Sequence, residues 1–281
     1  PTWKRLLDAR VTPNKPLKRV LVTHMHPDHV GCAGWLCYKY GAELWMSRLE
    51  YITCRMLVSD TGREAPRTGI DFYRRAGWDD AQIDNYKERF GGFGRGVSQM
   101  PDAFERLSDG DTFRMGGQNW EVITGNGHSP EHSCLYCPDL NVLISGDQLL
   151  PRISSNVSVH PTEPNANPLL DWMASCERLL ERLPPDVLVL PAHNEPFRGA
   201  HERLRHLIDG HETALSRLHG RLQKGPLMVT DTFTTLFGRA IKPDEVGMAT
   251  GEAIAHLNCM IHRGDVTSAV GEDGIARYRL V

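Results

Sequence analysis

The sequence predicts an α/β fold that is followed by a mainly helical C-terminal region. Short β-rich apolar segments alternate with amphipathic helical segments up to about residue 200. Several of the apolar segments end at a histidine or an aspartate, at the sheet edge where α/β proteins place their sites. The length of 281 residues fits one large domain, or a large domain with a smaller one.

The first segments predict a strand, a helix and a second strand. Residues 17–23 are a short β-rich apolar run, which is typical of a strand buried in a sheet. Residues 30–40 favour a helix that Gly41 ends, and residues 42–46 favour the next strand.

Residues 47–108 interrupt this alternation and predict a helical insertion. Ser47 and Glu50 have the spacing of a capping box, which would open a helix to about Leu57. Two more helical segments and a glycine-rich joint are expected at residues 71–76, 80–90 and 91–96. The joint is not a dinucleotide fingerprint, because Val97 replaces the last glycine and no strand precedes it. The insertion is either a lid over a site or a structural appendage.

The second half of the chain predicts further strands and then a change of character. Strands are expected at residues 111–115, 120–124, 133–137, 141–145 and 187–190. Asn167 as cap and Pro168 in the first turn predict a helix to about Leu183. Three helices and a hairpin are then expected at residues 201–222, 230–237, 243–263, 267–270 and 276–280. That order is typical of a winged-helix module, so we predict a catalytic domain at 1–200 and a winged-helix-like domain at 201–281.

Composition limits the partners and the compartment. The net charge of −3 favours neither nucleic acid nor an anionic membrane, and no apolar run could span a bilayer. The seven cysteines are odd in number and widely spread, which predicts a reducing, cytoplasmic compartment without disulfides. Cys134 and Cys137 have CxxC spacing, but we interpret them as apolar strand residues.

The segment that follows the first strand carries a candidate metal site. His24, His26, Asp28 and His29 fall within six residues. Imidazole nitrogens and a carboxylate are the ligands that suit zinc and neighbouring transition metals. Residues 24 and 26 can point toward one ion, and Asp28 and His29 can reach a second one. The density of ligands argues against a solvated loop that is rich in histidine by accident.

Three later strand ends carry further candidate ligands. His128 lies in a Gly-His-Ser-Pro segment after the strand at 120–124, and Asp147 follows the strand at 141–145. His193 follows the strand at 187–190. Four strand ends that each bring a ligand type to one sheet edge predict a single site there.

These motifs, HxHxDH at His24, GHSP at His128, GD at Asp147 and the isolated His193, resemble the metallo-β-lactamase-fold hydrolases over about residues 17–200. The resemblance implies a four-layer αββα fold and two divalent metal ions, zinc first, with iron or manganese as alternatives. It also implies two ligand sets joined by a bridging carboxylate: His24, His26 and His128; Asp28, His29 and His193; and Asp147. Asp28 and Asp147 are the carboxylates to which we assign catalytic roles.

The chemistry of such a site is consistent with the resemblance. A shared carboxylate offsets the repulsion between two dications and fixes their spacing. Metal binding lowers the pKa of a water to about 7, so that a hydroxide can attack a carbonyl carbon or a phosphorus. No serine nucleophile motif is evident, and none is needed.

One departure from the family concerns the start of the chain. Family members usually carry a longer segment before HxHxDH, including strands of the first sheet. Here 23 residues precede His24, and the chain begins with Pro1 rather than Met. We therefore expect either a fragment or an incomplete first sheet.

Within the superfamily, the bridging Asp147 and the HxHxDH motif look like the glyoxalase II and thioesterase-like branch. This implies hydrolysis of an ester, thioester or lactone, a small-molecule substrate. The C-terminal module resembles that of lactamase-like endoribonucleases, but ten basic and ten acidic residues after residue 200 offer no phosphate-binding surface. Such a module more often packs on its neighbour or on a second subunit. A metal-dependent binding or sensor protein is the third alternative.

The other histidines carry weaker expectations. His132 either supports the site or is an ordinary strand residue, and His160 either faces the cleft or does not. The six histidines after residue 200 are interpreted as surface or core residues.

Overall fold

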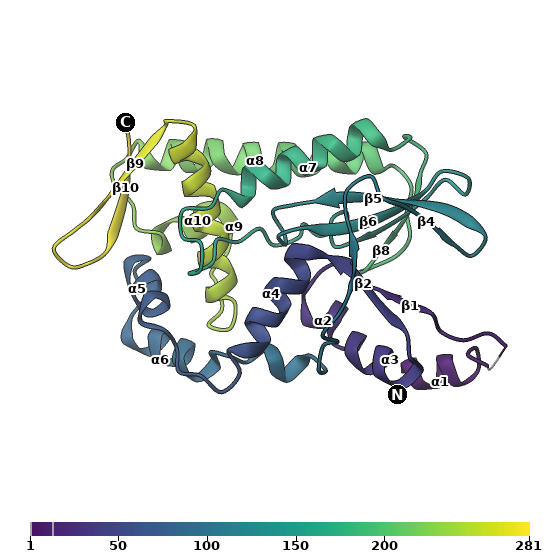
Figure 1. Ribbon diagram of the computed structural model, residues 1–281. Coiled ribbons are helices and arrows are strands. Elements are labelled where there is room, and N and C mark those ends of the chain that lie inside the picture. Colours follow the sequence, from purple (N-terminus) through teal and green to yellow (C-terminus); the bar gives the residue numbers. More distant parts are fainter. Residues whose placement is uncertain (1, 13) are drawn as a thin grey trace.

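The computed structural model describes residues 2–12 and 14–281 and shows two β-sheets packed face to face, with helices on their outer sides (Figure 1). The first sheet has the order β1-β2-β3, and its strands are all parallel. These strands are β1 (Arg19–Leu21), β2 (Glu43–Ser47) and β3 (Glu105–Leu107).

The second sheet has the order β4-β5-β6-β7-β8. Its neighbouring strands are antiparallel except for β7 and β8, which are parallel. The strands are β4 (Thr112–Met115), β5 (Gln118–Gly125), β6 (His132–Cys137), β7 (Val142–Gly146) and β8 (Leu188–Pro191).

The helices before the second sheet are α1 (Thr2–Asp8), α2 (Pro27–Val30), α3 (Ala33–Tyr40), α4 (Arg48–Ser59), α5 (Arg67–Arg75), α6 (Asp80–Arg89) and the 3₁₀ turn η1 (Phe93–Gly96). Those within or after it are α7 (Pro168–Arg182), α8 (Ala200–Leu222), η2 (Thr230–Thr232), α9 (Phe233–Phe237) and α10 (Val246–His262). The chain ends with the antiparallel hairpin of β9 (Val266–Val270) and β10 (Ala276–Leu280).

Three hydrophobic clusters account for the four layers. Leu107 of the first sheet packs with Trp120 and Leu135 of the second, between the sheets. A second cluster joins the first sheet to α3 and α4, and it includes Met46 of β2 and Cys54 of α4. The third joins the second sheet to α7 and α8. Burial of apolar surface between the layers is the main stabilising contribution to this fold, and it confirms the four-layer αββα prediction.

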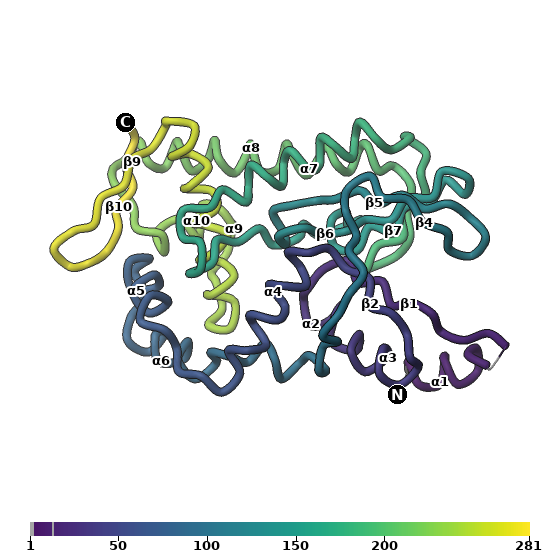
Figure 2. Tube along the Cα trace, in the orientation of Figure 1, coloured from purple at the N-terminus to yellow at the C-terminus, as the bar shows by residue number. Residues whose placement is uncertain are grey.

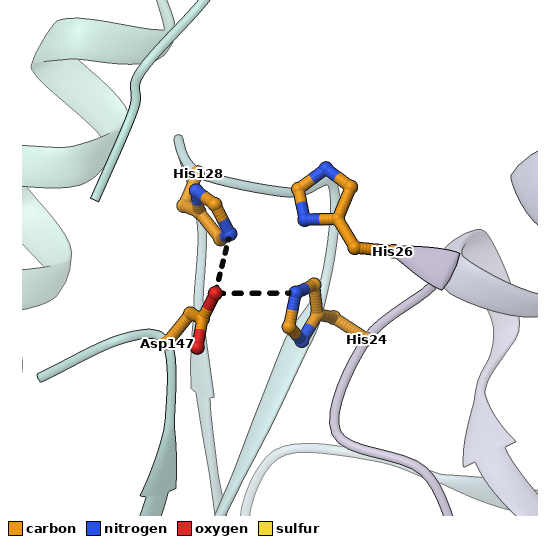
Figure 3. A group of neighbouring side chains, drawn as sticks. All are labelled: His24, His26, His128 and Asp147. Atoms are coloured by element: carbon orange, nitrogen blue, oxygen red, sulfur yellow. Dashed lines mark ion pairs between the residues drawn. The ribbon is translucent and has the colours of Figure 1, made fainter. Parts of the chain in front are cut away.

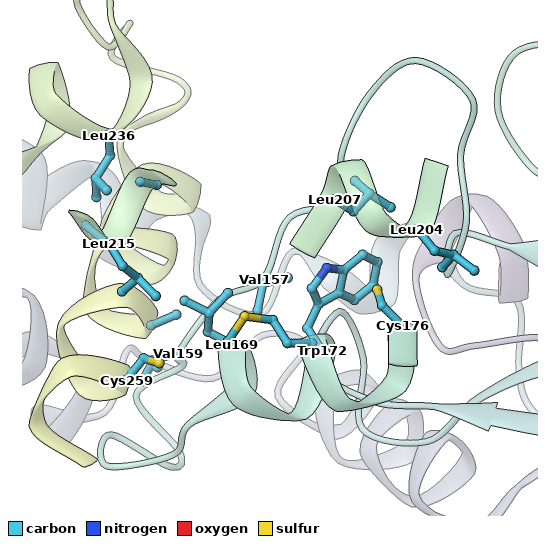
Figure 4. Close-up of a cluster of buried hydrophobic side chains, with 14 of the residues drawn as sticks. Val157, Val159, Leu169, Trp172, Cys176, Leu204, Leu207, Leu215, Leu236 and Cys259 are labelled. Carbon is cyan, nitrogen blue, oxygen red and sulfur yellow. The ribbon is translucent and has the colours of Figure 1, made fainter. Parts of the chain in front are cut away.

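The third cluster continues from α7 into the C-terminal helices (Figure 4). Fully buried Trp172 of α7 belongs to the same cluster as Leu215 of α8 and Cys259 of α10. The order of helices, hairpin included, is the predicted one. The boundary near residue 200 and the winged-helix assignment stay predictions, because one hydrophobic core runs through both parts.

The segment 47–108 differs from its prediction in two respects. It contains a strand, β3, which pairs with β2. This strand has only three residues, which is too short for a periodic pattern of apolar residues to be recognised in the sequence. Ser47 is the N-cap residue of α4, but its side chain makes no capping hydrogen bond, so the predicted capping box is wrong. The true capping box of this segment is formed by Asp79 and Gln82 at the start of α6.

Other local predictions are confirmed. Gly41 ends α3 in the left-handed conformation, and Asn167 accepts a hydrogen bond from the Leu170 backbone at the start of α7. Cys134 and Cys137 are both buried in β6, yet they belong to different clusters on opposite faces of the strand. All seven cysteines are free. Among the described residues, no helix is long and apolar enough to cross a membrane.

Candidate metal centre

The seven predicted ligands come from the ends of four strands at one edge of the two sheets. His24 and His26 follow β1, and Asp28 and His29 lie in the short helix α2. His128 lies between β5 and β6, Asp147 directly follows β7, and His193 lies just after β8. Their side chains form two groups in which the possible ligand atoms lie within 4.8 Å of one another: His24, His26, His128 and Asp147; and Asp28, His29 and His193.

The first group is largely buried, with His24 and Asp147 buried and His26 and His128 partly buried. The ring of His24 is fully buried, and its Nε2 lies 3.8 Å from Oδ2 of Asp147. Nε2 of His128 lies 3.5 Å from the same oxygen. His26 lies across the group from Asp147, so that three imidazoles and one carboxylate face a common point (Figure 3).

The second group is open to solvent. Oδ2 of Asp28 lies 3.3 Å from Nε2 of His29 and 3.3 Å from Nε2 of His193. The side chains of Asp28 and His193 are 58% and 43% exposed. Solvent therefore reaches the centre from this side.

Asp147 lies between the two groups. Its Oδ2 faces His24 and His128, whereas its Oδ1 lies 3.4 Å from Nε2 of both His29 and His193. Burial by itself would raise the pKa of this carboxyl, but the histidine side chains beside it lower the pKa overall. One anionic carboxylate is thus shared by both groups.

The residues present fit two divalent metal ions. Ligands about 2.1 Å from a tetrahedral ion lie roughly 3.4 Å apart, which is close to the separations between Asp147 and its histidine neighbours. Three histidine Nε2 atoms and Oδ1 of Asp147 are buried and have no hydrogen-bond partner: His24, His29, His128 and Asp147. Unsatisfied buried polar atoms are costly, and one ion in each group would together satisfy all four. Burial lowers the pKa of His26 to about 4, so its ring is neutral and able to ligate.

Hydrogen bonds on the far side of two rings orient their Nε2 atoms toward the site. Nδ1 of His128 lies 2.8 Å from the Asn156 carbonyl oxygen, which can only accept, so Nδ1 carries the proton. Nε2 of His128 is then left with its lone pair toward Asp147. Nδ1 of His24 is hydrogen-bonded to the Thr23 hydroxyl at 3.1 Å.

His132 contacts two of the candidate ligands, Asp147 and His24, and supports the centre. Its Nε2 accepts a hydrogen bond from the Asp147 backbone N–H at 3.1 Å, and its ring stacks on that of His24. Gly146 leaves room for this contact: its φ is +51°, and a Cβ there would lie 2.5 Å from Nε2 of His132. Of the two alternatives for His132, the structure favours the supporting role.

Glu50 and Ser47 also support the centre, and no sequence pattern indicated this role. The carboxylate of Glu50 is buried and accepts hydrogen bonds from the Met25 backbone, at 2.8 Å, and the Glu131 backbone, at 2.7 Å. Met25 lies between two ligands, and Glu131 follows the His128 segment. The Ser47 hydroxyl donates to the Glu131 carbonyl oxygen. The Glu131 carboxylate accepts a hydrogen bond from the Leu49 backbone N–H at the start of α4. These contacts hold the loop of His24 and His26 and the loop of His128 against the start of α4.

The remaining histidines lie outside both groups. His160 is exposed and lines a cavity between α6 and α10. Of the C-terminal histidines, His211 and His256 are buried, and their rings lie 3.4 Å apart at Nδ1 and Nε2. Within the described part of the chain, no C-terminal histidine joins the two ligand groups.

The αββα layers and a doubled His/Asp site define the class of metallo-β-lactamase-fold proteins. Residues 2–193 match the metallo-beta-lactamase superfamily, and residues 215–281 match its metallo-beta-lactamase-like C-terminal domain. The chain belongs to the metallo-beta-lactamase superfamily.

Solved structures agree with this assignment. A beta-lactamase domain protein from Burkholderia ambifaria is 36% identical, with a TM-score of 0.88 over 99% of this chain and 79% of that one. A metallo-beta-lactamase family protein from Thermus thermophilus is 25% identical, with a TM-score of 0.74 over 94% of this chain and 80% of that one.

Curated relatives are more distant and include several hydrolases. A linear primary-alkylsulfatase of Pseudomonas is 24% identical over 77% of this chain and 41% of its own length. An atrochrysone carboxyl ACP thioesterase of Aspergillus fumigatus is 25% identical over 73% of this chain and 35% of its own length. A hydroxyacylglutathione hydrolase of Haemophilus influenzae is 27% identical over 47% of this chain and 50% of its own length. The matches thus span half or less of each of these three enzymes.

We expect the purified protein, supplemented with zinc, iron or manganese, to bind about two ions per chain, one for each group. Ions that bind only the folded state stabilise it, so chelation should lower the Tm by about 5–10 °C. Elemental analysis and thermal unfolding would measure both effects. A His219→Ala variant, altered outside both groups, is the control. Fewer than one ion per chain after supplementation would contradict the two-ion interpretation.

Proposed function

We propose that the protein hydrolyses an ester, a thioester or a lactone at a dinuclear metal centre. The observation that carries this proposal is the place of Asp147, whose two oxygens face the two ligand groups separately. Bound divalent ions would supply a hydroxide nucleophile at neutral pH and stabilise the oxyanion that develops on the substrate. Zinc is the proposed metal, and iron and manganese are the alternatives that the same ligands allow.

The exposure of the candidate ligands indicates the side from which a substrate would enter. The group around His24 is buried, whereas Asp28 and His193 are exposed, so the substrate would enter over the second group. Asp28 lies at that open side, where its carboxylate can accept a proton during the reaction. His132 and Thr23 hold Asp147 and His24 in place, which keeps the ligand groups preorganised.

Two relatives support the choice of an acyl substrate. The thioesterase and the hydroxyacylglutathione hydrolase are named for cleavage of acyl compounds. Sulfate-ester hydrolysis is the second candidate, because an alkylsulfatase matches 77% of this chain. The balanced charge of the C-terminal region continues to disfavour an endoribonuclease.

A side-by-side substrate screen tests the proposal. Metal-loaded protein is assayed with acyl thioesters, aryl esters, lactones, an alkyl sulfate and single-stranded RNA. We expect the acyl compounds to be hydrolysed in preference, with the activity lost on chelation and restored by metal. Cleavage of RNA alone would favour the endoribonuclease, cleavage of the alkyl sulfate alone the sulfatase, and full metal loading without turnover a binding or sensor protein.

A further inference from the structure

A cavity of about 350 Å³ lies between the helical insertion and the C-terminal helices. Its walls come from α5 and α6, from the start of α10, and from the loop after Asp147 that includes Asn156 and His160. Figure 2 shows α5 and α6 running beside the α9–α10 region. The two parts are in direct contact, because the Trp78 indole N–H donates to the Thr250 hydroxyl at 2.9 Å.

One wall of this cavity is aromatic. The rings of Tyr73 and Trp78 stack with centroids 4.2 Å apart, and Tyr86 lies 4.8 Å from Tyr73. The hydrogen bond to Thr250 fixes the Trp78 ring. Burial raises the pKa of Tyr73 to about 12, so its phenol stays neutral. Aromatic faces of this kind suit a flat apolar ligand.

The wall formed by the start of α10 is apolar and can adapt to a ligand. Met248 is 57% exposed, although it is a large apolar residue, and it lines the cavity beside Val246. A thioether side chain can adjust its shape to an aromatic ring. The charged lining residues are one cation, Arg89, and one anion, Asp244, so the cavity has no net charge to attract a phosphate.

The cavity lies next to the metal centre. Asn156 lines it, and the carbonyl oxygen of the same residue accepts the hydrogen bond from His128 Nδ1. Behind this loop α10 packs closely, since a Cβ on Gly251 would lie 2.7 Å from the Ser158 side chain. Asn156 is the residue common to both places, and a remote group of a substrate held at the metal centre would reach the cavity past it.

We propose that this cavity binds an uncharged aromatic group of the substrate, remote from the bond that is cleaved. The identity of the cleaved bond rests on the proposed function, whereas the aromatic preference rests on the cavity. Since the insertion supplies the aromatic wall, it would act as a specificity element fixed against α10.

Kinetics with a matched pair of thioesters test the proposal. The substrates are the phenylhexanoyl and hexanoyl thioesters of N-acetylcysteamine, which differ only in the terminal ring. We expect the wild type to favour the phenylhexanoyl compound in kcat/KM by about tenfold or more. Met248→Trp and Asn85→Trp, exposed residues on facing walls, would narrow the cavity and bring this ratio close to one. Met56→Trp, on an exposed residue of α4 that does not line the cavity, should keep the wild-type ratio. No preference in the wild type, or a preference that both cavity variants keep, would overturn the proposal.

A binding measurement separates this proposal from the proposed hydrolysis. Phenylhexanoic acid is titrated into the metal-loaded wild type and each variant by calorimetry, which requires no turnover. Binding that weakens about tenfold in Met248→Trp and Asn85→Trp, but not in Met56→Trp, supports the cavity even if no thioester is hydrolysed. Equal affinities in all four proteins, or no binding to the wild type, would show that the cavity does not hold such a group.

Discussion

Replacing Asp147 with asparagine should reduce kcat/KM by about 10²–10³-fold and lower the metal content below two ions per chain. The carboxylate faces four histidine Nε2 atoms through two oxygens: those of His24, His29, His128 and His193. Asparagine keeps the shape but loses the negative charge, and its amide nitrogen has no lone pair for an ion. The repulsion between two dications would then no longer be offset. Metal content by elemental analysis and steady-state kinetics are the measurements.

The control for this variant is Asp139→Asn, which changes an exposed aspartate in the turn before β7. It should retain wild-type metal content and kcat/KM. If Asp147→Asn still bound two ions and turned over like the control, Asp147 would not be a shared ligand and the dinuclear proposal would lose its main support.

The candidate ligands could be predicted from sequence because they lie in the segments that follow apolar strands. The His24–His29 cluster needed no long-range information, since four candidate ligands fall within six residues. His128, Asp147 and His193 were found at strand ends. The structure brings His128 and Asp147 to His24 and His26, and His193 to Asp28 and His29. Their division into two groups came from resemblance to a family, and the structure groups them in the same way, with Asp147 between.

The supports of the site could not be predicted in this way. Ser47 and Glu50 have the spacing of a capping box. A local pattern cannot show that Ser47 instead donates to the carbonyl of Glu131, 84 residues away, and that Glu50 accepts from the Glu131 backbone N–H. The strand β3 has three residues and is recognised as a strand only by its pairing with β2. Such features depend on tertiary contacts, which override local propensity.

Glu50 gives the second large expected effect, and it acts on stability. Replacing it with alanine would leave two backbone N–H groups without acceptors, the buried one of Met25 and the partly buried one of Glu131. Each unsatisfied buried group costs about 1–3 kcal/mol, so the free energy of unfolding should fall by about 2–6 kcal/mol. Metal affinity should fall about 10–100-fold as well, because the loops that carry the ligands would lose their common support. Denaturant unfolding of the metal-free protein and metal titration measure the two effects separately.

Two further variants make this expectation specific. Glu50→Gln keeps one acceptor oxygen of nearly the same shape, so its loss of stability should be intermediate between those of the wild type and the alanine variant. Glu88→Ala removes an exposed glutamate of α6 and should change the free energy of unfolding by less than about 0.5 kcal/mol. An alanine variant at position 50 as stable as Glu88→Ala would mean that water or a local shift satisfies both N–H groups. A stability loss with unchanged metal affinity would confine Glu50 to the fold and assign the positioning of the ligands to His132 and Thr23 instead.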